Sequence, residues 1–256
     1  GTERLVDLIN ALTGEKVTAN PSLLLGSADM SVYSVTQLYQ FLASGGRVQP
    51  LHAVLGVLDA QGKVLNRYEV KPTKAQKGDA IAARLVSIAM QQTVTSGTAR
   101  ALLSDGLGDL QSAGKTGTSN DSRDSWYAGF TGDHLTVVWV GNDKNEPTGL
   151  YGATGGMRVW SNLYKRLPTR PLIFSGEGLE WTYLDQAQFA TTDEFCLGAR
   201  RAVFVAGYLP TEAVSCGDKP AESNSWMDWI TDKFSGNKED NSASENADST
   251  SNAADQ

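Results

Sequence analysis

Hydrophobic residues recur at helical spacing in the first part of the chain. Residues 2–12 carry such a stripe, which predicts a helix. A loop containing Pro21 follows, and either Ser31 or Ser34 is a suitable N-cap for a second helix. The glycines of Ser44–Gly46 end that helix, because glycine tolerates the left-handed backbone found at helix C-termini.

The pattern changes to short extended segments after Pro50. Strands are predicted near residues 51–59 and 63–70, joined as a β-hairpin through a turn that contains Gly62. A long helical stripe then covers residues 78–94, and residues 96–104 predict a further short helix after a glycine break.

The hydrophobic period becomes extended again at Gln111. Residues 112–119, 124–132 and 135–143 predict three strands joined by polar turns, which indicates an antiparallel meander. A helix over residues 155–167 follows and ends before Pro168. The expected fold class is therefore α+β, with an antiparallel sheet flanked by helices.

The C-terminal third divides into two parts. Strands are predicted at 179–185 and 200–210, within a small C-terminal extension that we place at residues 174–217. Residues 218–256 are rich in Ser, Asn, Asp and Glu and predict an acidic, mostly disordered tail. Residues 1–173 remain as the main domain.

The net charge of −7 is concentrated in this tail. Residues 217–256 hold nine acidic and three basic residues, so the rest of the chain carries only −1 and has no basic stripe. No hydrophobic run approaches the ~20 residues of a membrane helix. His52 and His134 lie far from each other and from both cysteines, so no metal site is expected, and nucleic acid is excluded as a partner.

The stretch "SAGKTGTSN" (residues 112–120) has three readings. A phosphate-binding loop requires glycine five positions before Gly114, but Asp109 stands there and no helix follows. A polar edge strand without chemistry is the second reading. The third is one element of a serine acyl-transfer site, since Lys-Thr-Gly is one of three motifs in penicillin-recognising enzymes.

The motif residues suit acyl transfer to or from a peptide. Lys115 supplies a positive charge for a substrate carboxylate and eases proton transfer near a serine. The hydroxyls of Thr116 and Thr118 are hydrogen-bond donors for the same carboxylate. Gly117 lets a peptide lie against the strand edge, and a backbone N–H there completes an oxyanion hole.

The region "GKTGTSNDSRDSWYAGFTGDHLTVVWVGND" closely resembles the corresponding strands of class A penicillin-binding proteins. The segment "LLLGSADMSVYSVTQLYQFLASGGRVQP" is similar to the helical part that precedes them. "AMQQTVTSGTAR" resembles the family's V-x-x-GTA stretch and "GATGGMRVWSNLYKRL" its final helix. The resemblance covers residues 1–173 and implies the C-terminal part of a transpeptidase domain with the penicillin-binding/serine β-lactamase-like fold.

The resemblance implies a peptidoglycan D,D-transpeptidase that acts through a serine acyl-enzyme and needs no cofactor. Lys115 and Thr118 are the expected catalytic residues, the latter through its amide in the oxyanion hole. Thr116, Gly117 and Thr118 are the expected substrate-binding residues. The positions Asn120, Arg123, Asp124 and Trp126 also match, and we read them as turn and strand positions, with Arg123 and Asp124 forming a local ion pair.

The family also needs an S-x-x-K motif, which carries the nucleophile, and an S-x-N motif, both before Lys-Thr-Gly. Ser112–Lys115 fits by letter but overlaps the strand, where residues three apart point to opposite faces. Ser235–Lys238 and Ser244–Asn246 fit only within the tail. All three are read as chance matches. The nucleophile, a glycosyltransferase domain and a membrane anchor are therefore expected upstream, and this chain alone is expected to be inactive.

The resemblance places the protein at the periplasmic face of the bacterial inner membrane. Its implied partners are peptidoglycan stem peptides or their lipid-linked precursor, β-lactams and regulatory proteins. An oxidising compartment favours a Cys196–Cys216 disulfide, which composition leaves open. Alternative functions are a D,D-carboxypeptidase, a β-lactamase relative or a non-catalytic peptidoglycan-binding module.

Overall fold

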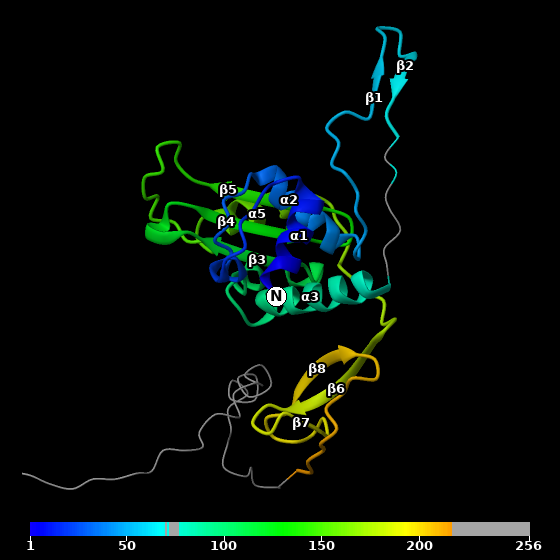
Figure 1. Ribbon diagram of the computed structural model, residues 1–256, viewed down its shortest axis with the longest axis vertical. Helices are drawn as coiled ribbons and strands as arrows, with labels where there is room; N and C mark the ends of the chain where they lie inside the picture. The colour runs from blue at the N-terminus through cyan, green and yellow to red at the C-terminus, as the bar shows by residue number, and fades with distance from the viewer. Residues whose placement is uncertain (70, 72–76, 217–256) are drawn as a thin grey trace, which may run out of the picture. The chain divides into compact units, whose positions relative to one another are not determined.

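The computed structural model describes residues 1–69, 71 and 77–216 (Figure 1). The chain forms two compact units. The first contains Gly1–Glu180 with Phe204–Ala206, and the second contains Trp181–Val203 with the residues from Gly207 on. The predicted acidic tail, 218–256, lies outside the described residues.

Two helices at the start of the chain follow the predicted stripes. Helix α1 spans Thr2–Thr13 and α2 spans Val32–Ala43. Ser31 is the N-cap of α2, because its side chain accepts a hydrogen bond from the backbone N–H of Ser34. The predicted loop between the helices contains a short 3₁₀ helix, Pro21–Leu25.

The predicted meander is confirmed. Strands β3 (Ala113–Thr118), β4 (Ser125–Phe130) and β5 (Leu135–Val140) form an antiparallel sheet in the order β3-β4-β5. Thr116 lies opposite Tyr127, and Thr118 lies opposite Ser125. Strand β3 therefore has a strand neighbour on one side only among the described residues.

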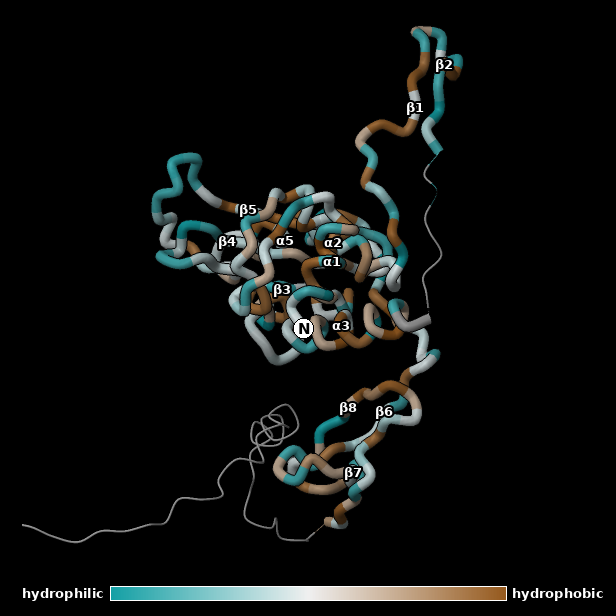
Figure 2. The backbone as a smooth tube through the Cα atoms, viewed as in Figure 1, coloured by the Kyte–Doolittle hydropathy of each residue, from teal (hydrophilic) through white to brown (hydrophobic). Residues whose placement is uncertain are grey.

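Helices contact both faces of this sheet. They are α3 (Lys77–Thr95) and α5 (Gly156–Tyr164), together with α2, while the short helix α4 (Ala101–Ser104) contacts α3. Tyr127 points to the face that carries Trp160 and Tyr164 of α5, while Phe130 points to the face that carries Met90 of α3 and Leu42 of α2. Hydrophobic residues gather where these helices meet the sheet, whereas the loop after β5 is hydrophilic (Figure 2).

The side chain of Tyr127 lies over two glycines on one face of the sheet. Tyr127 is fully buried and meets Trp160 edge-on, with ring centroids 5.4 Å apart. A Cβ atom at Gly114 would lie 2.1 Å from the Tyr127 hydroxyl, and one at Gly129 would lie 2.7 Å from its ring. Both positions must therefore be glycine for the ring to occupy this place.

The predicted hairpin exists, but its strands are shorter than predicted. They are β1 (Gly56–Leu58) and β2 (Val64–Arg67), and every residue in both is exposed. Asp59 closes the turn by accepting hydrogen bonds from the backbone N–H groups of Gln61 and Lys63. Because neither face of the hairpin is buried, the two strands pair over fewer residues than the predicted ranges 51–59 and 63–70.

The second sheet has the order β7-β6-β8. Strand β6 (Leu179–Asp185) matches the predicted one, and β8 (Arg200–Val205) is shorter than the predicted 200–210, whereas β7 (Ala190–Thr192) was not predicted. Its three residues follow Phe189, which has a φ of 49°. A strand this short carries too few alternations for a period to be recognised.

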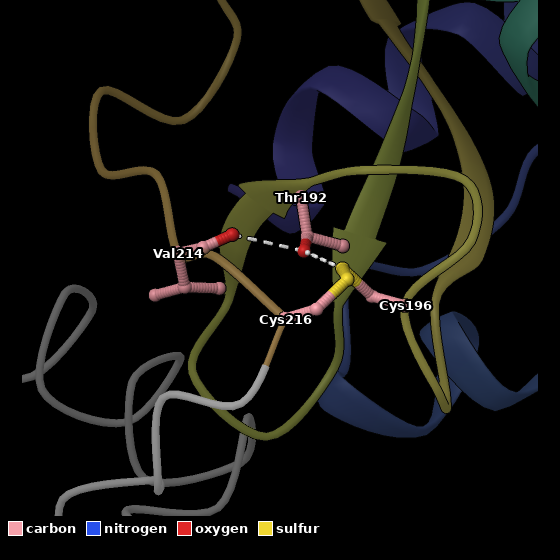
Figure 3. The surroundings of a disulfide bond; sticks show 4 residues. All are labelled: Thr192, Cys196, Val214 and Cys216. Carbon is pink, nitrogen blue, oxygen red and sulfur yellow. Dashed lines mark hydrogen bonds between the residues drawn. A yellow bond between two sulfur atoms is a disulfide. The ribbon is translucent and has the colours of Figure 1, made fainter.

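A disulfide joins Cys196 and Cys216 in the second unit (Figure 3). The Thr192 hydroxyl lies beside it, 3.1 Å from the Cys196 sulfur and 2.9 Å from the carbonyl oxygen of Val214. The cross-link closes the last described residues onto β7 and the loop after it. A small unit buries little apolar surface, so the disulfide adds stability that its core alone does not supply.

No helix within the described residues is both long enough and apolar enough to span a bilayer.

Asp105 connects α4 to α5 through a small charged cluster. Its carboxylate accepts a hydrogen bond from the Ser161 hydroxyl at 2.8 Å and pairs with Arg158 at 3.0 Å and Lys165 at 3.2 Å. The Asp105 side chain is 15% exposed. The Ser161 hydrogen bond is the main cause of its lowered pKa, with Lys165 and Arg158 contributing.

Asp105→Asn should lower the free energy of unfolding at pH 7 by about 1 kcal/mol, since both cationic partners are partly exposed. The pKa of Asp105 is lowered in the folded state, so its contribution is present above about pH 4 and is lost as the pH falls through the folded-state pKa. Denaturant unfolding of both proteins at pH 7 and pH 3 should show a difference that shrinks in acid. Asp109→Asn, an exposed acid nearby, is the control, and an equal loss at both pH values would contradict the role.

Candidate active site

The Lys-Thr-Gly-Thr motif occupies the second half of edge strand β3. Lys115 is exposed, and its ammonium group donates a hydrogen bond to the carbonyl oxygen of Thr116 at 2.9 Å. Thr116 and Thr118 share one face of the strand, and Lys115 and Gly117 share the other. The structure thus presents the motif along a strand edge that has no strand neighbour among the described residues.

Thr116 is held from the end of α3. Its hydroxyl lies 2.9 Å from the hydroxyl of Thr98, in the turn between α3 and α4. A second threonine, Thr93, donates a hydrogen bond to the carbonyl oxygen of Gly114 at 2.5 Å. The C-terminal end of α3 is therefore joined to the motif strand at two points.

Thr118 is held from the loop before α5. The backbone N–H of Gly152 donates to the Thr118 hydroxyl oxygen at 2.9 Å. The buried hydroxyl of Ser125 fixes the same loop, because it donates to the carbonyl oxygen of Tyr151 and accepts from the N–H of Gly156. An N–H group can only donate, so the Thr118 hydroxyl keeps its own proton for another acceptor.

Gly152 approaches the strand so closely that a side chain does not fit. A Cβ atom there would lie 2.8 Å from the carbonyl oxygens of Gly117 and Trp126 and 2.8 Å from the Cβ of Thr116. The sequence "GATGG" identified the family's final helix, but its pattern does not reveal this contact. Thr98, Ser125 and Gly152 were all missed as site residues, because their partners lie 18 to 34 positions away in the chain.

Ser112 is not placed to act with Lys115. Ser112 is 1% exposed, and its hydroxyl has no hydrogen-bond partner within the described part of the chain, whereas Lys115 is exposed. This agrees with reading Ser112–Lys115 as a chance match to S-x-x-K. The other two matches, Ser235–Lys238 and Ser244–Asn246, lie outside the described residues.

The expected ion pair between Arg123 and Asp124 is wrong. Arg123 pairs with Asp121 at 3.2 Å, while Asp124 accepts a hydrogen bond from the Trp139 ring nitrogen at 2.8 Å. The turn after β3 contains a short 3₁₀ helix, Asn120–Ser122, whose Asp121 has a φ of 59°. This backbone conformation brings Asp121 rather than Asp124 to the guanidinium group. Asn120 and Trp126 lie in turn and strand, as expected.

Among the described residues, one group of potential metal ligands lies close together: the ligand atoms of Asp193, Cys196 and Cys216 are within 4.8 Å of one another. Both sulfur atoms of that group are bonded to each other. A thiolate is the form that binds a metal, so this group does not fit a metal ion while the disulfide is intact.

The Lys-Thr-Gly-Thr motif lies on the edge strand of an antiparallel sheet flanked by helices, and Lys-Thr-Gly is one of three motifs of the penicillin-recognising acyl transferases. The family described as "Penicillin binding protein transpeptidase domain" matches residues 6–156. The chain belongs to this family.

The similar proteins include penicillin-binding protein 1B from Vibrio cholerae, 40% identical over 181 residues, or 68% of this chain and 23% of that protein. Penicillin-binding protein 1B from Escherichia coli is 41% identical over 152 residues, or 59% of this chain and 18% of that protein. The chain thus spans about a quarter or less of the length of these relatives.

Two solved structures share the fold. Penicillin-binding protein 1A from Haemophilus influenzae matches 84% of this chain and 38% of its own, with a TM-score of 0.70 and 20% identity. The penicillin-binding protein PonA1 from Mycobacterium tuberculosis matches 62% of this chain and 45% of its own, with a TM-score of 0.50 and 25% identity. The fold class expected from the sequence is confirmed.

Gly152→Ala should destabilise the first unit, because the new methyl group meets backbone atoms of β3 and β4 that cannot rotate away. The expected loss is about 1–3 kcal/mol, the usual effect of overpacking. Thermal unfolding measures it. Gly176→Ala is the matched control, since a Cβ there meets nothing within 4 Å and the φ is not positive. An unchanged melting temperature for Gly152→Ala would show that the loop does not rest on β3.

Proposed function

We propose that this chain forms the substrate-carboxylate side of a peptidoglycan D,D-transpeptidase site. Its substrates are peptidoglycan stem peptides that end in D-Ala-D-Ala, presented on the polymer or its lipid-linked precursor. β-Lactams, which also carry a carboxylate beside a reactive carbonyl, are inhibitors of the same site. The observation that carries the proposal is the Lys115–Thr118 strand at a sheet edge within a member of the transpeptidase family.

The motif residues have distinct roles in this proposal. The hydroxyls of Thr116 and Thr118 donate to the substrate carboxylate, and Lys115 supplies the positive charge that attracts it. Thr118 is suited to this role because Gly152 occupies its acceptor side and leaves its proton available. Gly117 lets the stem peptide approach as an added strand, and the Thr118 amide forms part of the oxyanion hole.

The acyl transfer itself needs a serine from outside this chain. That serine attacks the carbonyl carbon of the penultimate D-alanine, the peptide bond breaks, and terminal D-alanine leaves with a proton on its nitrogen. An amine of a neighbouring stem peptide then attacks the ester, which forms the cross-link and releases the serine. By analogy with class A relatives, the serine, a glycosyltransferase domain and a membrane anchor are supplied by the rest of a longer protein.

The proposed location is the periplasmic face of the inner membrane. The Cys196–Cys216 disulfide supports it, since structural disulfides persist in oxidising compartments and are rare in the cytosol. Regulatory protein partners remain a prediction from the family resemblance.

Lys115→Ala in the full-length protein should reduce the second-order rate constant of acylation by a β-lactam about 100-fold, since the carboxylate loses its cationic partner. Covalent labelling by a fluorescent penicillin over time measures this rate constant. Lys144→Ala, at an exposed lysine in the loop after β5, is the control and should leave the rate constant unchanged. A normal rate for Lys115→Ala would refute the proposed role.

The 256-residue chain by itself should form no covalent adduct with a fluorescent penicillin. The reason is chemical: Ser112 is buried just before the motif strand, and no other serine in the described residues precedes a lysine by three positions. Intact-mass spectrometry after incubation with excess β-lactam is the measurement, with the full-length protein as the positive control. Stoichiometric mass addition to the isolated chain would show that it carries its own nucleophile.

A further inference from the structure

The hydrogen bond between the hydroxyls of Thr98 and Thr116 can run in either direction, and its direction decides whether the Thr116 proton is available to a ligand. Their hydroxyl oxygens lie 2.9 Å apart, and either residue is able to donate. Each hydroxyl has one proton and two acceptor lone pairs. If Thr116 donates to Thr98, its only proton is used within the protein. If Thr98 donates, the Thr116 proton is available to a ligand.

Thr98 is held at this place by its neighbours in the turn after α3. A Cβ atom at Gly97 would lie 2.7 Å from the Cα of Thr93, so only glycine allows the turn to close against the helix. Ala99 is fully buried, and its backbone N–H donates to the carbonyl oxygen of Thr93 at 2.9 Å. The Thr93 hydroxyl in turn bonds the carbonyl oxygen of Gly114 in β3. Position 98 is thus fixed to Thr93 of α3 by contacts of both neighbouring residues, and the Thr93 side chain links α3 to the motif strand.

We propose that Thr98 is a positioning residue that donates its proton to the Thr116 hydroxyl oxygen and so directs the Thr116 proton to the substrate carboxylate. The inference rests on the proposed function, in which Thr116 binds that carboxylate. A carboxylate only accepts hydrogen bonds, so Thr116 must be its donor when the two are in contact. The contact with Thr98 then persists only with Thr98 as donor.

The two motif threonines thereby receive matching support. Gly152 donates to Thr118 through a backbone N–H, which fixes the direction of that hydrogen bond. Thr98 supports Thr116 through a hydroxyl that can also accept, so this hydrogen bond takes the direction Thr98 to Thr116 when Thr116 gives its proton to the carboxylate. A hydroxyl that accepts one hydrogen bond becomes a better donor in the next. Thr98 thus strengthens the hydrogen bond from Thr116 to the carboxylate without touching the carboxylate itself.

The test uses the full-length protein and a fluorescent penicillin that carries a free carboxylate. Thr98→Val keeps the shape of the side chain but has no hydroxyl, and it should lower the second-order acylation rate constant about tenfold, the size of one net hydrogen bond. Thr98→Ser keeps the donor and should restore the rate constant to near the wild-type value. Thr95→Val is the matched control, since the Thr95 hydroxyl bonds only the Gln92 carbonyl of its own helix among the described contacts.

A double-mutant cycle separates positioning from a general structural effect. If Thr98 acts through Thr116, Thr98→Val should cost nothing further when Thr116 is already valine. Additive losses, or a Thr98→Val rate equal to wild type, would overturn the inference while leaving the proposed function intact. If the wild-type protein is not acylated at all, the proposed function fails, and the inference fails with it. The melting temperature of each variant checks that the fold is retained.

Discussion

The place of the motif strand depends on how Tyr127 packs across the sheet. Its ring lies over Gly114 and Gly129, where no side chain fits, and it meets Trp160 of α5 edge-on. The first part of β3 is thereby pressed against β4 and the hydrophobic core. In the second part, Lys115 and Thr118 are exposed, while Thr116 and Gly117 are half-buried. Ala113 and Gly114 at the start of β3 are buried, whereas the motif residues Lys115 and Thr118 further along are exposed.

Hydroxyl groups then fix the strand from several directions. Thr93 and Thr98 reach it from the end of α3, and Thr118 receives a backbone N–H from the loop that Ser125 supports. Each contact alone contributes little net free energy. Together they hold the backbone and the hydroxyl oxygens of the motif in place, while the direction of the Thr98–Thr116 hydrogen bond stays open. Such preorganisation is what electrostatic catalysis requires, since the donors need not reorient during the reaction.

The sequence predicted the long helices and the meander well, because long amphipathic stripes and clear alternation carry strong signals. Of the short helix predicted at residues 96–104, only Ala101–Ser104 is helical, and the residues before it form a turn. The sequence missed β7, whose three residues show no period, and it overestimated the strands of an exposed hairpin. The motif strand was identified from its Lys-Thr-Gly-Thr sequence, but the residues that hold it in place were not. Thr98 and Gly152 contact the strand across long sequence separations, and one chain without an alignment does not reveal such pairs. The ion pair of Arg123 was misassigned because Asp121 has a left-handed backbone conformation.

The hydrogen bond from Gly152 to Thr118 also makes one backbone amide sensitive to events at the motif. When the Thr118 hydroxyl donates to an anion, its oxygen becomes a stronger acceptor for the Gly152 N–H. The electron density around that amide proton changes although no ligand atom touches it. If the strand binds a carboxylate as proposed, the Gly152 amide is therefore a native reporter of that binding. Since glycine amides resonate in a sparsely populated region of a nitrogen-correlated NMR spectrum, occupancy of the strand is readable without attaching a dye.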